Sequence, residues 1–298
     1  MITSIEYTNF KSLKKVTIPF NKITVLAGLN SAGKSSVIQG LLLSRALADF
    51  LHGRESLDIQ DIKKFPLNGD YLLSLGSATE AISKDTGKQF EIAVKGTKGE
   101  VTNEFRNLFY TTEALSDKLY DVSVKVGNNY KSTFIYETAL YYLNAERLGP
   151  RIRHWVNEKG GDLNCGYRGE YTVEVLAHTQ ANSDPEFLVP DSKFLGGRKL
   201  EGFQDIPKYA RAWMDYITPG ADIGAANIIG KIRSAEISVN GNTPPNVGFG
   251  ISYVLPIVVT GLLAKPGAVI IVENPEAHLH PKGQSNLGFF LGQIASSM

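Results

Sequence analysis

The chain has 298 residues, 43% of them hydrophobic, so it can bury a core of ordinary size in one large domain or two modest ones. Its 31 basic and 30 acidic residues leave a net charge of +1, which excludes a bulk electrostatic attraction to nucleic acid or to an anionic membrane. The single cysteine, Cys165, excludes an internal disulfide. Residues 1–20 lack a signal peptide's apolar run, and no run of about 18 apolar residues predicts a membrane span. We therefore expect a cytoplasmic protein without a membrane partner.

The first part of the chain predicts three strands and a helix. Apolar and polar residues alternate around Ile5 and Tyr7 and again over residues 16–20, a pattern typical of half-buried strands. The compact apolar run at residues 23–27 predicts a buried parallel strand. Apolar side chains then recur at helical spacing, which predicts a helix over residues 34–51.

The middle of the chain is less regular. Short β-rich stretches alternate with turns at residues 71–75, 90–94, 122–126 and 133–143. Residues 157–200 are rich in Gly, Asn and Asp and predict an irregular insertion. A helix with one apolar face is predicted over residues 203–217, and Pro219 and Gly220 would end it.

The last part of the chain is the most orderly. A strand is predicted over residues 235–239, and an apolar helix runs from about residue 250 to residue 264. Residues 268–272 predict a second buried strand, and the loop 273–281 precedes a final helix. Together these patterns predict an α/β fold with a mixed sheet.

Residues 28–35 read Gly-Leu-Asn-Ser-Ala-Gly-Lys-Ser and form a G-x-x-x-x-G-K-S pattern between a predicted strand and a predicted helix. In this phosphate loop the glycines let backbone N–H groups turn toward phosphate, and the helix N-terminus favours an anion. Lys34 would reach the β and γ phosphates of ATP, and the Ser35 hydroxyl would ligate Mg²⁺. A glycine-rich turn that matches by chance is the disfavoured alternative. The residues expected to bind ATP here are Gly28, Asn30, Ser31, Ala32, Gly33, Lys34, Ser35 and Ser36.

A carboxylate follows the second apolar strand directly. Val272 ends that run and Glu273 comes next, which places the carboxylate at the carboxyl edge of the sheet, where open α/β sheets bind ligands. We predict that Glu273 and Ser35 together hold Mg²⁺. An ordinary carboxylate at the end of a strand is the alternative.

Five segments carry a family resemblance. Residues 9–12 (Asn-Phe-Lys-Ser) and the phosphate loop resemble the ABC-type ATPase heads of the SMC, RecF and OLD superfamily. Residues 273–281 resemble the combined Walker B segment and D-loop of that group, and residues 247–252 resemble its ABC signature. Residues 142–151 resemble a further segment of predicted prokaryotic ATPases, which often occur in anti-phage defence loci and sometimes beside a nuclease.

The resemblance implies a P-loop NTPase core like an ABC or SMC head, built from residues 1–51 and 235–298, with residues 52–234 as an inserted β-rich and helical lobe. It also implies that two heads meet head-to-tail around ATP, so that Gly250 and Ser252 of one head contact the γ-phosphate on the other. ATP, Mg²⁺, a second copy in a homodimer or higher oligomer and an effector nuclease are the implied ligands and partners. A pair of packing glycines before a core helix is the alternative for residues 248 and 250.

Two departures from the family pattern concern catalysis. Asn274 stands where most relatives carry a glutamate that activates water, and an amide cannot accept the proton. Hydrolysis is therefore expected to be slow, or Glu276 takes this role; Lys34, Asn274 and Glu276 are the candidate catalytic residues. Relatives also continue with another strand and a Thr-His-Ser-type segment, which does not occur before Met298. Either the chain is truncated or its γ-phosphate sensor is lost or supplied by a partner.

Two weaker signals remain. His278 and His280 have a spacing that can chelate zinc, but no further soft ligand accompanies them, so we favour the D-loop interpretation. A basic patch beside Trp155 could contact nucleotide, nucleic acid or a carboxylate partner, and a solvated basic loop is the favoured interpretation. The patch consists of Arg147, Arg151, Arg153 and His154.

Three functional hypotheses follow. The leading one is a Mg²⁺-dependent ATPase that dimerises on ATP and serves as sensor or motor of a prokaryotic defence system. The second is a nucleotide-gated scaffold with little turnover, which Asn274 favours. The third is a DNA-repair ATPase, although the neutral net charge does not indicate DNA as a partner.

Overall fold

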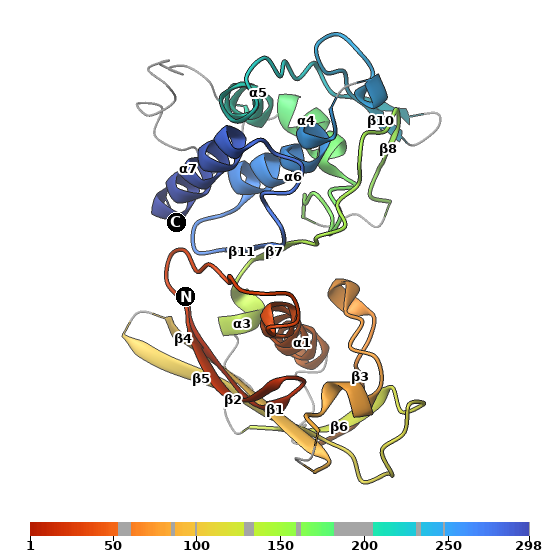
Figure 1. The fold of residues 1–298 in the computed structure, drawn as a ribbon, viewed down its shortest axis with the longest axis vertical. Coiled ribbons are helices and arrows are strands. Elements are labelled where there is room, and N and C mark those ends of the chain that lie inside the picture. Colours follow the sequence, from red (N-terminus) through yellow and green to blue (C-terminus); the bar gives the residue numbers. More distant parts are fainter. Residues whose placement is uncertain are drawn as a thin grey trace. The chain divides into compact units, whose positions relative to one another are not determined.

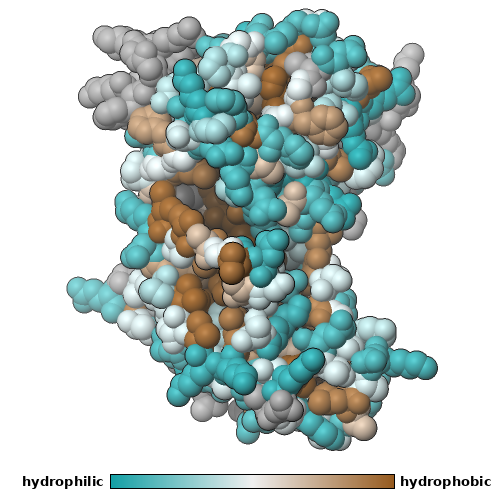
Figure 2. Space-filling model, viewed as in Figure 1, coloured by the Kyte–Doolittle hydropathy of each residue, from teal (hydrophilic) through white to brown (hydrophobic). Residues whose placement is uncertain are grey.

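The computed structural model describes residues 1–52, 61–84, 87–98, 100–127, 134–158, 162–181, 205–230, 234–246 and 248–297. Contacts divide the chain into two compact units, Met1–Thr138 and Ala139–Met298, which we call the N-terminal and C-terminal units and describe separately. Hydrophilic side chains cover most of the face shown in Figure 2, and apolar ones gather in smaller groups. None of the described helices is long and apolar enough to cross a membrane.

The N-terminal unit is built on one antiparallel sheet with the strand order β2-β1-β4-β5-β6-β3. Its strands are β1 (Ile2–Phe10), β2 (Leu13–Pro19), β3 (Asp61–Pro66), β4 (Gln89–Lys98), β5 (Val101–Tyr110) and β6 (Asp121–Val126). Its helices are α1 (Lys34–His52), α2 (Ala78–Ala81), α3 (Phe134–Glu137) and a 3₁₀ turn at Asp70–Leu72. Figure 1 shows α1 lying against one face of this sheet.

The alternation of side chains along β1 explains how α1 docks. Ile5 and Tyr7 are buried, as expected for one face of a pleated strand. The Tyr7 hydroxyl donates a hydrogen bond to the Val37 carbonyl in α1 at 2.5 Å. Gly40 makes this approach possible, because a Cβ atom at that position would overlap the Tyr7 ring. The start of α1 is therefore fixed against the strand.

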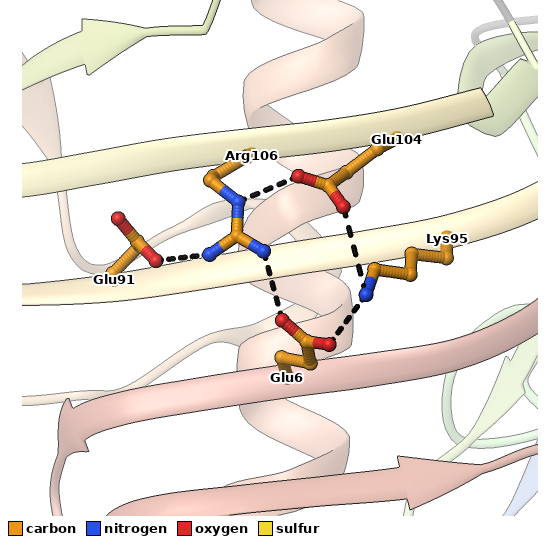
Figure 3. Close-up of polar contacts among 5 residues, drawn as sticks. All are labelled: Glu6, Glu91, Lys95, Glu104 and Arg106. Atoms are coloured by element: carbon orange, nitrogen blue, oxygen red, sulfur yellow. Dashed lines mark hydrogen bonds and ion pairs between the residues drawn. The ribbon is translucent and has the colours of Figure 1, made fainter.

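The opposite face of the same sheet carries a network of charges (Figure 3). Arg106 on β5 contacts Glu6 at 2.8 Å, Glu104 at 2.6 Å and also Glu91. Lys95 on β4 contacts Glu6 at 2.5 Å and Glu104 at 3.6 Å. These partners lie on three neighbouring strands, so the network ties β1, β4 and β5 together on the side away from the core.

The C-terminal unit is mainly helical. Its helices are α4 (Thr172–Ala181), α5 (Ile206–Ile217), α6 (Phe249–Leu263), α7 (Pro281–Ser297) and a 3₁₀ turn at Pro244–Asn246. Its strands are β7 (Leu140–Leu143), β8 (His154–Trp155), β9 (Asn227–Ile229), β10 (Ser234–Glu236) and β11 (Val269–Val272). Strands β7 and β11 form a parallel pair, and β8-β10-β9 form an antiparallel sheet. Helix α6 is apolar almost all round because α4, α5, α7 and the β7–β11 pair surround it.

The prediction of an α/β fold is confirmed. The predicted strands around Ile5 and over residues 16–20 correspond to β1 and β2, and the predicted helix over residues 34–51 corresponds to α1. Residues 90–94 and 122–126 lie in β4 and β6.

The orderly end of the chain also matches the prediction, with α6, β11 and α7 in their expected places. The helix expected over residues 203–217 begins at Ile206, where the Asp205 side chain accepts a hydrogen bond from the Lys208 amide at 2.9 Å. Residues 203 and 204 lie outside the described part of the chain. The strand expected over 235–239 is shorter, since β10 ends at Glu236.

The prediction of a buried strand at residues 23–27 is wrong. Ile23 is 49% exposed and Val25 79% exposed, and no described strand pairs with this run. An apolar composition favours a strand, but pairing is needed to form one, and the edge strand β2 ends before this run begins.

Three further expectations in the middle of the chain need correction. Residues 71–75 form no strand, because Tyr71 and Leu72 have positive φ angles of 57° and 55° within a 3₁₀ turn. The stretch 133–143 divides into α3 and β7, with residue 133 outside the described part. Helix α4 lies within the region 157–200, where only irregular structure was expected, although residues 159–161 and 182–200 are not described.

The predicted domain organisation joins the two ends of the chain into one ATPase core. A core from residues 1–51 and 235–298 would combine segments of both units, with residues 52–234 as the lobe. The two units are compact by themselves, with the boundary between Thr138 and Ala139. The combined core therefore stays a prediction.

Candidate functional site

The phosphate loop has the backbone of an anion-binding turn. Gly28 and Gly33 have positive φ angles of 149° and 94°, and Ser31 lies in the left-handed region at 65°. The Ala32 amide donates to the Leu29 carbonyl at 3.2 Å, which closes a tight turn in the middle of the loop. Helix α1 begins at once, with the first helical hydrogen bond from Val37 to the Gly33 carbonyl at 3.1 Å. The first amides of α1 thus follow the loop directly, as an anion site at a helix N-terminus requires.

Lys34 folds back over this loop. Its Nζ donates to the carbonyl oxygens of Gly28 at 2.7 Å and Leu29 at 2.8 Å. The ammonium group is therefore held across the opening of the loop by weak neutral acceptors. Phosphate oxygens are charged acceptors and form stronger hydrogen bonds, so they can replace these carbonyls.

The turn between β1 and β2 supports the loop from outside. Asn9 and Lys11 have positive φ angles of 59° and 51°, which makes the turn tight. A Cβ atom at Gly33 would lie only 3.1 Å from the Ser12 Oγ, so the turn and the loop are in close contact. Lys11 donates to Gln39 of α1 at 2.9 Å, and burial lowers its pKa. Residues 9–12, which the sequence singled out by resemblance, therefore pack against the phosphate loop.

The second part of the candidate site is the acidic turn, residues 273–278, which follows β11. The Glu273 amide continues the β7–β11 ladder by donating to the Leu143 carbonyl at 2.9 Å. The Glu273 carboxylate accepts a 2.6 Å hydrogen bond from the Tyr142 hydroxyl. Burial, and then this bond to Glu273, raise the pKa of Tyr142 well above its usual value, so the hydroxyl keeps its proton.

The candidate catalytic residues in the acidic turn are solvent-exposed. Asn274 and Glu276 are both exposed, and Asn274 has a positive φ of 45°. Asparagine adopts this left-handed conformation more readily than glutamate does. The turn is closed by hydrogen bonds from Ala277 to the Asn274 carbonyl and from Leu279 to the Glu276 carbonyl, each 3.2 Å. The structure thus gives a conformational reason for asparagine at 274.

The signature-like segment lies at the start of α6. Gly248 is the N-cap of the helix, and Val247 lies outside the described residues. A Cβ atom at Gly250 would lie 2.7 Å from the His278 carbonyl oxygen, too close for any other residue. Packing against the acidic turn, the alternative weighed for these glycines, therefore has direct support at Gly250. The contacts of Gly250 and Ser252 with a γ-phosphate stay predictions.

The basic patch divides into two groups with different surroundings. The interpretation as a solvated loop is wrong for Arg147, which is only 3% exposed and donates to backbone carbonyls. Arg151 and Arg153 are exposed, as a solvated loop requires. The Arg151 guanidinium lies over the Trp155 ring at 5.7 Å from its centroid. Sequence reasoning missed the role of Arg147 because three of its four hydrogen-bond partners lie 106 to 127 positions away in the chain.

The residues present are suited to the predicted ligands. The phosphate loop supplies amide and ammonium donors for phosphate, and Ser35 and Glu273 offer the hard oxygen donors that Mg²⁺ prefers. Within the described residues, no group of three His, Cys, Asp or Glu side chains is placed to hold a metal, which gives the zinc alternative no support. The predicted ATP ligands Gly28 and 30–36 lie in the N-terminal unit. The other predicted site residues lie in the C-terminal unit: Glu273, Asn274, Glu276, Gly250 and Ser252. The joint Mg²⁺ site of Ser35 and Glu273 stays a prediction.

A glycine loop that closes ahead of a helix, with its lysine across the opening, is characteristic of P-loop ATPases. The family model described as an AAA ATPase domain matches residues 1–148, so this part of the chain is similar to an AAA ATPase domain. The matched range includes the phosphate loop, Tyr142 and Arg147 and ends before the acidic turn.

Solved structures show a general likeness. The SMC head domain from Thermotoga maritima is 8% identical with a TM-score of 0.45, and the alignment covers 99% of this chain and 85% of that one. The recombination mediator protein RecF of the RecFOR pathway is 12% identical with a TM-score of 0.46, covering 99% of this chain and 90% of that one. Curated proteins give no match. Neither structural likeness transfers a ligand or a partner to this chain.

Proposed function

We propose that this ATPase binds and hydrolyses ATP with Mg²⁺, slowly, and that two copies close around the nucleotide. The observation that carries the proposal is the position of Lys34, whose ammonium group lies across the phosphate loop on the carbonyls of Gly28 and Leu29. A triphosphate would take over these hydrogen bonds and would be held by amides of the loop and of the start of α1.

Each residue then has a defined part in the reaction. Lys34 holds the β and γ phosphates, and Ser35 and Glu273 hold the metal, which when bound neutralises charge on the phosphates. Asn274 orients the attacking water through its amide but cannot take the proton. Since Glu273 is assigned to the metal, the exposed Glu276, two residues further on, is the carboxylate of the acidic turn that would accept it. Without a base at 274, turnover is expected to be low, since general-base help contributes about 10²–10⁴-fold.

Dimerisation and a role in prokaryotic defence rest on the sequence resemblance of residues 142–151, 247–252 and 273–281. Exposed apolar side chains support a partner surface near the nucleotide segments. Leu29 in the phosphate loop is 86% exposed, and Phe249 at the start of α6 is 58% exposed. In the proposed dimer a second copy covers these side chains, and the effector of the defence system would be a nuclease. A cytoplasmic location and the absence of a membrane partner belong to the same proposal.

A nucleotide-gated scaffold is the second candidate, and Asn274 is the observation that favours it. The amide at this position, in a left-handed backbone conformation that suits asparagine, lets the chain bind ATP and hold the closed state with little hydrolysis. The two candidates share the phosphate loop and differ only in turnover.

The test compares wild type with Lys34→Ala and with Lys14→Ala, a matched loss of an exposed lysine on β2. ATP affinity is measured by calorimetry with and without Mg²⁺, turnover by phosphate release, and mass by light scattering. We expect wild type and Lys14→Ala to bind ATP and form an ATP-dependent dimer, and Lys34→Ala to lose both properties. Equal ATP binding by Lys34→Ala and wild type would refute the proposal. A dimer without measurable phosphate release would favour the scaffold.

A further inference from the structure

Arg147 ends in a ring of backbone carbonyl groups. Its Nη1 donates to the carbonyl oxygens of Asn144 at 3.0 Å and Glu273 at 2.6 Å, and its Nη2 donates to that of Asn274 at 2.7 Å. Its Nε donates to the Tyr253 carbonyl in α6 at 3.1 Å, and the guanidinium lies 5.5 Å from the centroid of the Tyr253 ring. One side chain therefore joins three segments: the loop after β7, the acidic turn and the first turns of α6.

The choice of arginine follows from this geometry. A guanidinium has five N–H donors in a rigid planar fork, whereas a lysine ammonium has three donors at one point and cannot reach carbonyls on several sides. All four acceptors are backbone atoms, so Arg147 fixes the course of the chain rather than the position of a partner side chain. Arg147 is almost fully buried and donates its hydrogen bonds to backbone carbonyls. This indicates that the backbone must keep a defined conformation where these carbonyls lie.

The Glu273 side chain is held from a second direction by the same segment of sequence. The Asn144 side-chain Nδ2 donates to the Tyr142 hydroxyl oxygen at 2.8 Å, which leaves the hydroxyl proton for Glu273. The Glu146 amide in turn donates to the Asn144 side-chain oxygen at 2.8 Å. Residues 142–147 thus orient both the carboxylate of Glu273 and its carbonyl.

We propose that Arg147 is a positioning residue that couples the start of α6 to the acidic turn, so that Glu273 and Asn274 keep the placement that metal and water require. Tyr142 assists by orienting the Glu273 carboxylate. The inference rests on the proposed function, because it concerns the metal acid of the same site. It predicts that the signature-like start of α6 and the metal acid move together, since Tyr253 and Glu273 share one guanidinium.

The test uses Arg147→Met, Arg147→Lys and Tyr142→Phe, with Arg151→Met as the matched control at an exposed arginine. Four quantities are measured: ATP affinity in EDTA, the Mg²⁺ concentration for half-maximal turnover, the midpoint of thermal unfolding, and hydrogen exchange of the Ala277 amide, which donates to the Asn274 carbonyl. The exchange measurement needs neither nucleotide nor metal. Circular dichroism checks folding, and Arg147→Lys and Tyr142→Phe carry the test if Arg147→Met does not fold.

We expect Arg147→Met to leave ATP affinity in EDTA within about twofold of wild type, because the phosphate loop is untouched. Its Mg²⁺ requirement should rise about 10- to 100-fold, the usual effect of removing a group that orients a metal ligand. Ala277 exchange should accelerate, Arg147→Lys should recover part of both effects, and Tyr142→Phe should raise the Mg²⁺ requirement without accelerating exchange.

A lower unfolding midpoint with an unchanged Mg²⁺ requirement in all three variants would mean that Arg147 only stabilises the fold, and would overturn the inference while the proposed function stands. Failure of the wild type to bind ATP would refute the proposed function and the inference with it. These two failures are distinguishable, because the first needs a wild type that binds ATP.

Discussion

The phosphate loop and the acidic turn are each held in a defined backbone conformation, but by different kinds of contact. Both hold a left-handed residue, Ser31 in one and Asn274 in the other. The hydrogen bonds that close the phosphate loop come from its own atoms, the Ala32 amide and the Lys34 ammonium, which bond to carbonyls three to six positions away, and residues 9–12 pack against it. The acidic turn has local hydrogen bonds as well, from the Ala277 and Leu279 amides, but Glu273 and Asn274 are also held by Arg147 and Tyr142, which lie 126 to 131 positions earlier in the chain. A local motif can therefore reveal the first site, whereas the control of the second is visible only in three dimensions.

The largest effect is expected in the acidic turn, at position 274, where a substitution would change the chemistry of hydrolysis. Asn274→Glu should raise turnover by about 10²-fold or more, because a carboxylate can take the proton from water. The matched control is Asn274→Gln, which has the same length and a similar cost of the left-handed backbone, on the order of 1 kcal/mol, without a proton acceptor. Phosphate release measures both. Equal rates in the two variants would show that the amide does not limit hydrolysis.

The second prediction tests whether ATP binding depends on the backbone conformation of the phosphate loop. Gly33→Ala places a Cβ atom 3.1 Å from Ser12 Oγ at a φ of 94°. A strain of about 1–3 kcal/mol should weaken ATP binding roughly 5- to 150-fold. Gly292→Ala in α7, where a Cβ atom meets nothing within 4 Å, is the control and should bind ATP normally. Calorimetry decides, and an unchanged affinity in Gly33→Ala would contradict the role of this turn.

A third variant tests the packing of the acidic turn on α6. Gly250→Ala places a Cβ atom 2.7 Å from the His278 carbonyl oxygen, whereas Gly248→Ala, two residues earlier, meets nothing within 4 Å. Overpacking should cost about 1–3 kcal/mol, and each kcal/mol lowers the unfolding midpoint by about 2–4 °C in a chain of this size. Both tryptophans, Trp155 and Trp213, lie in the C-terminal unit, so their fluorescence reports this unit alone. Equal midpoints in the two variants would show that the turn is free to move.

The smallest effect concerns the charge network of Figure 3, on the sheet face opposite to α1. Hydrogen bonds from Lys95 and then Arg106 lower the pKa of Glu6, and Arg106 lowers that of Glu104. A lowered folded pKa gives stability that is present above the ordinary carboxyl pKa of 4.5 and is lost as pH falls through the folded pKa.

Arg106→Met should therefore destabilise the N-terminal unit near neutral pH by no more than about 1 kcal/mol, because solvent screens these partly exposed pairs. The difference from wild type should vanish in acid and shrink in about 1 M salt. Urea unfolding followed by circular dichroism measures it, with Arg153→Met, which loses one exposed pair to Glu236, as the control. A difference that grows in acid would contradict this assignment.

A structural feature can be predicted from the sequence when the residues that cause it lie close together in the chain. The phosphate loop, α1 and α6 were predictable because glycine positions and helical spacing act within a few residues. The conformation of residues 23–27 could not be predicted in this way. A strand needs a neighbouring strand to pair with, and the composition of a segment does not identify that neighbour. The sequence favours a solvated loop for Arg147 because charge clusters usually lie in solvent, which is true of Arg151 and Arg153 but not of Arg147. Its carbonyl partners come from segments that only the fold of the C-terminal unit brings together.

The contact between Gly40 and Tyr7 has a consequence for how such chains vary in nature. The phosphate loop runs directly into α1, and α1 is seated on β1 by the Tyr7 bond to Val37 and by the missing side chain at position 40. A bulkier residue at 40 would lift the helix unless position 7 became smaller at the same time. Paired changes at these two buried positions would thus reset the start of α1, and with it the phosphate loop, so natural variants should change them together.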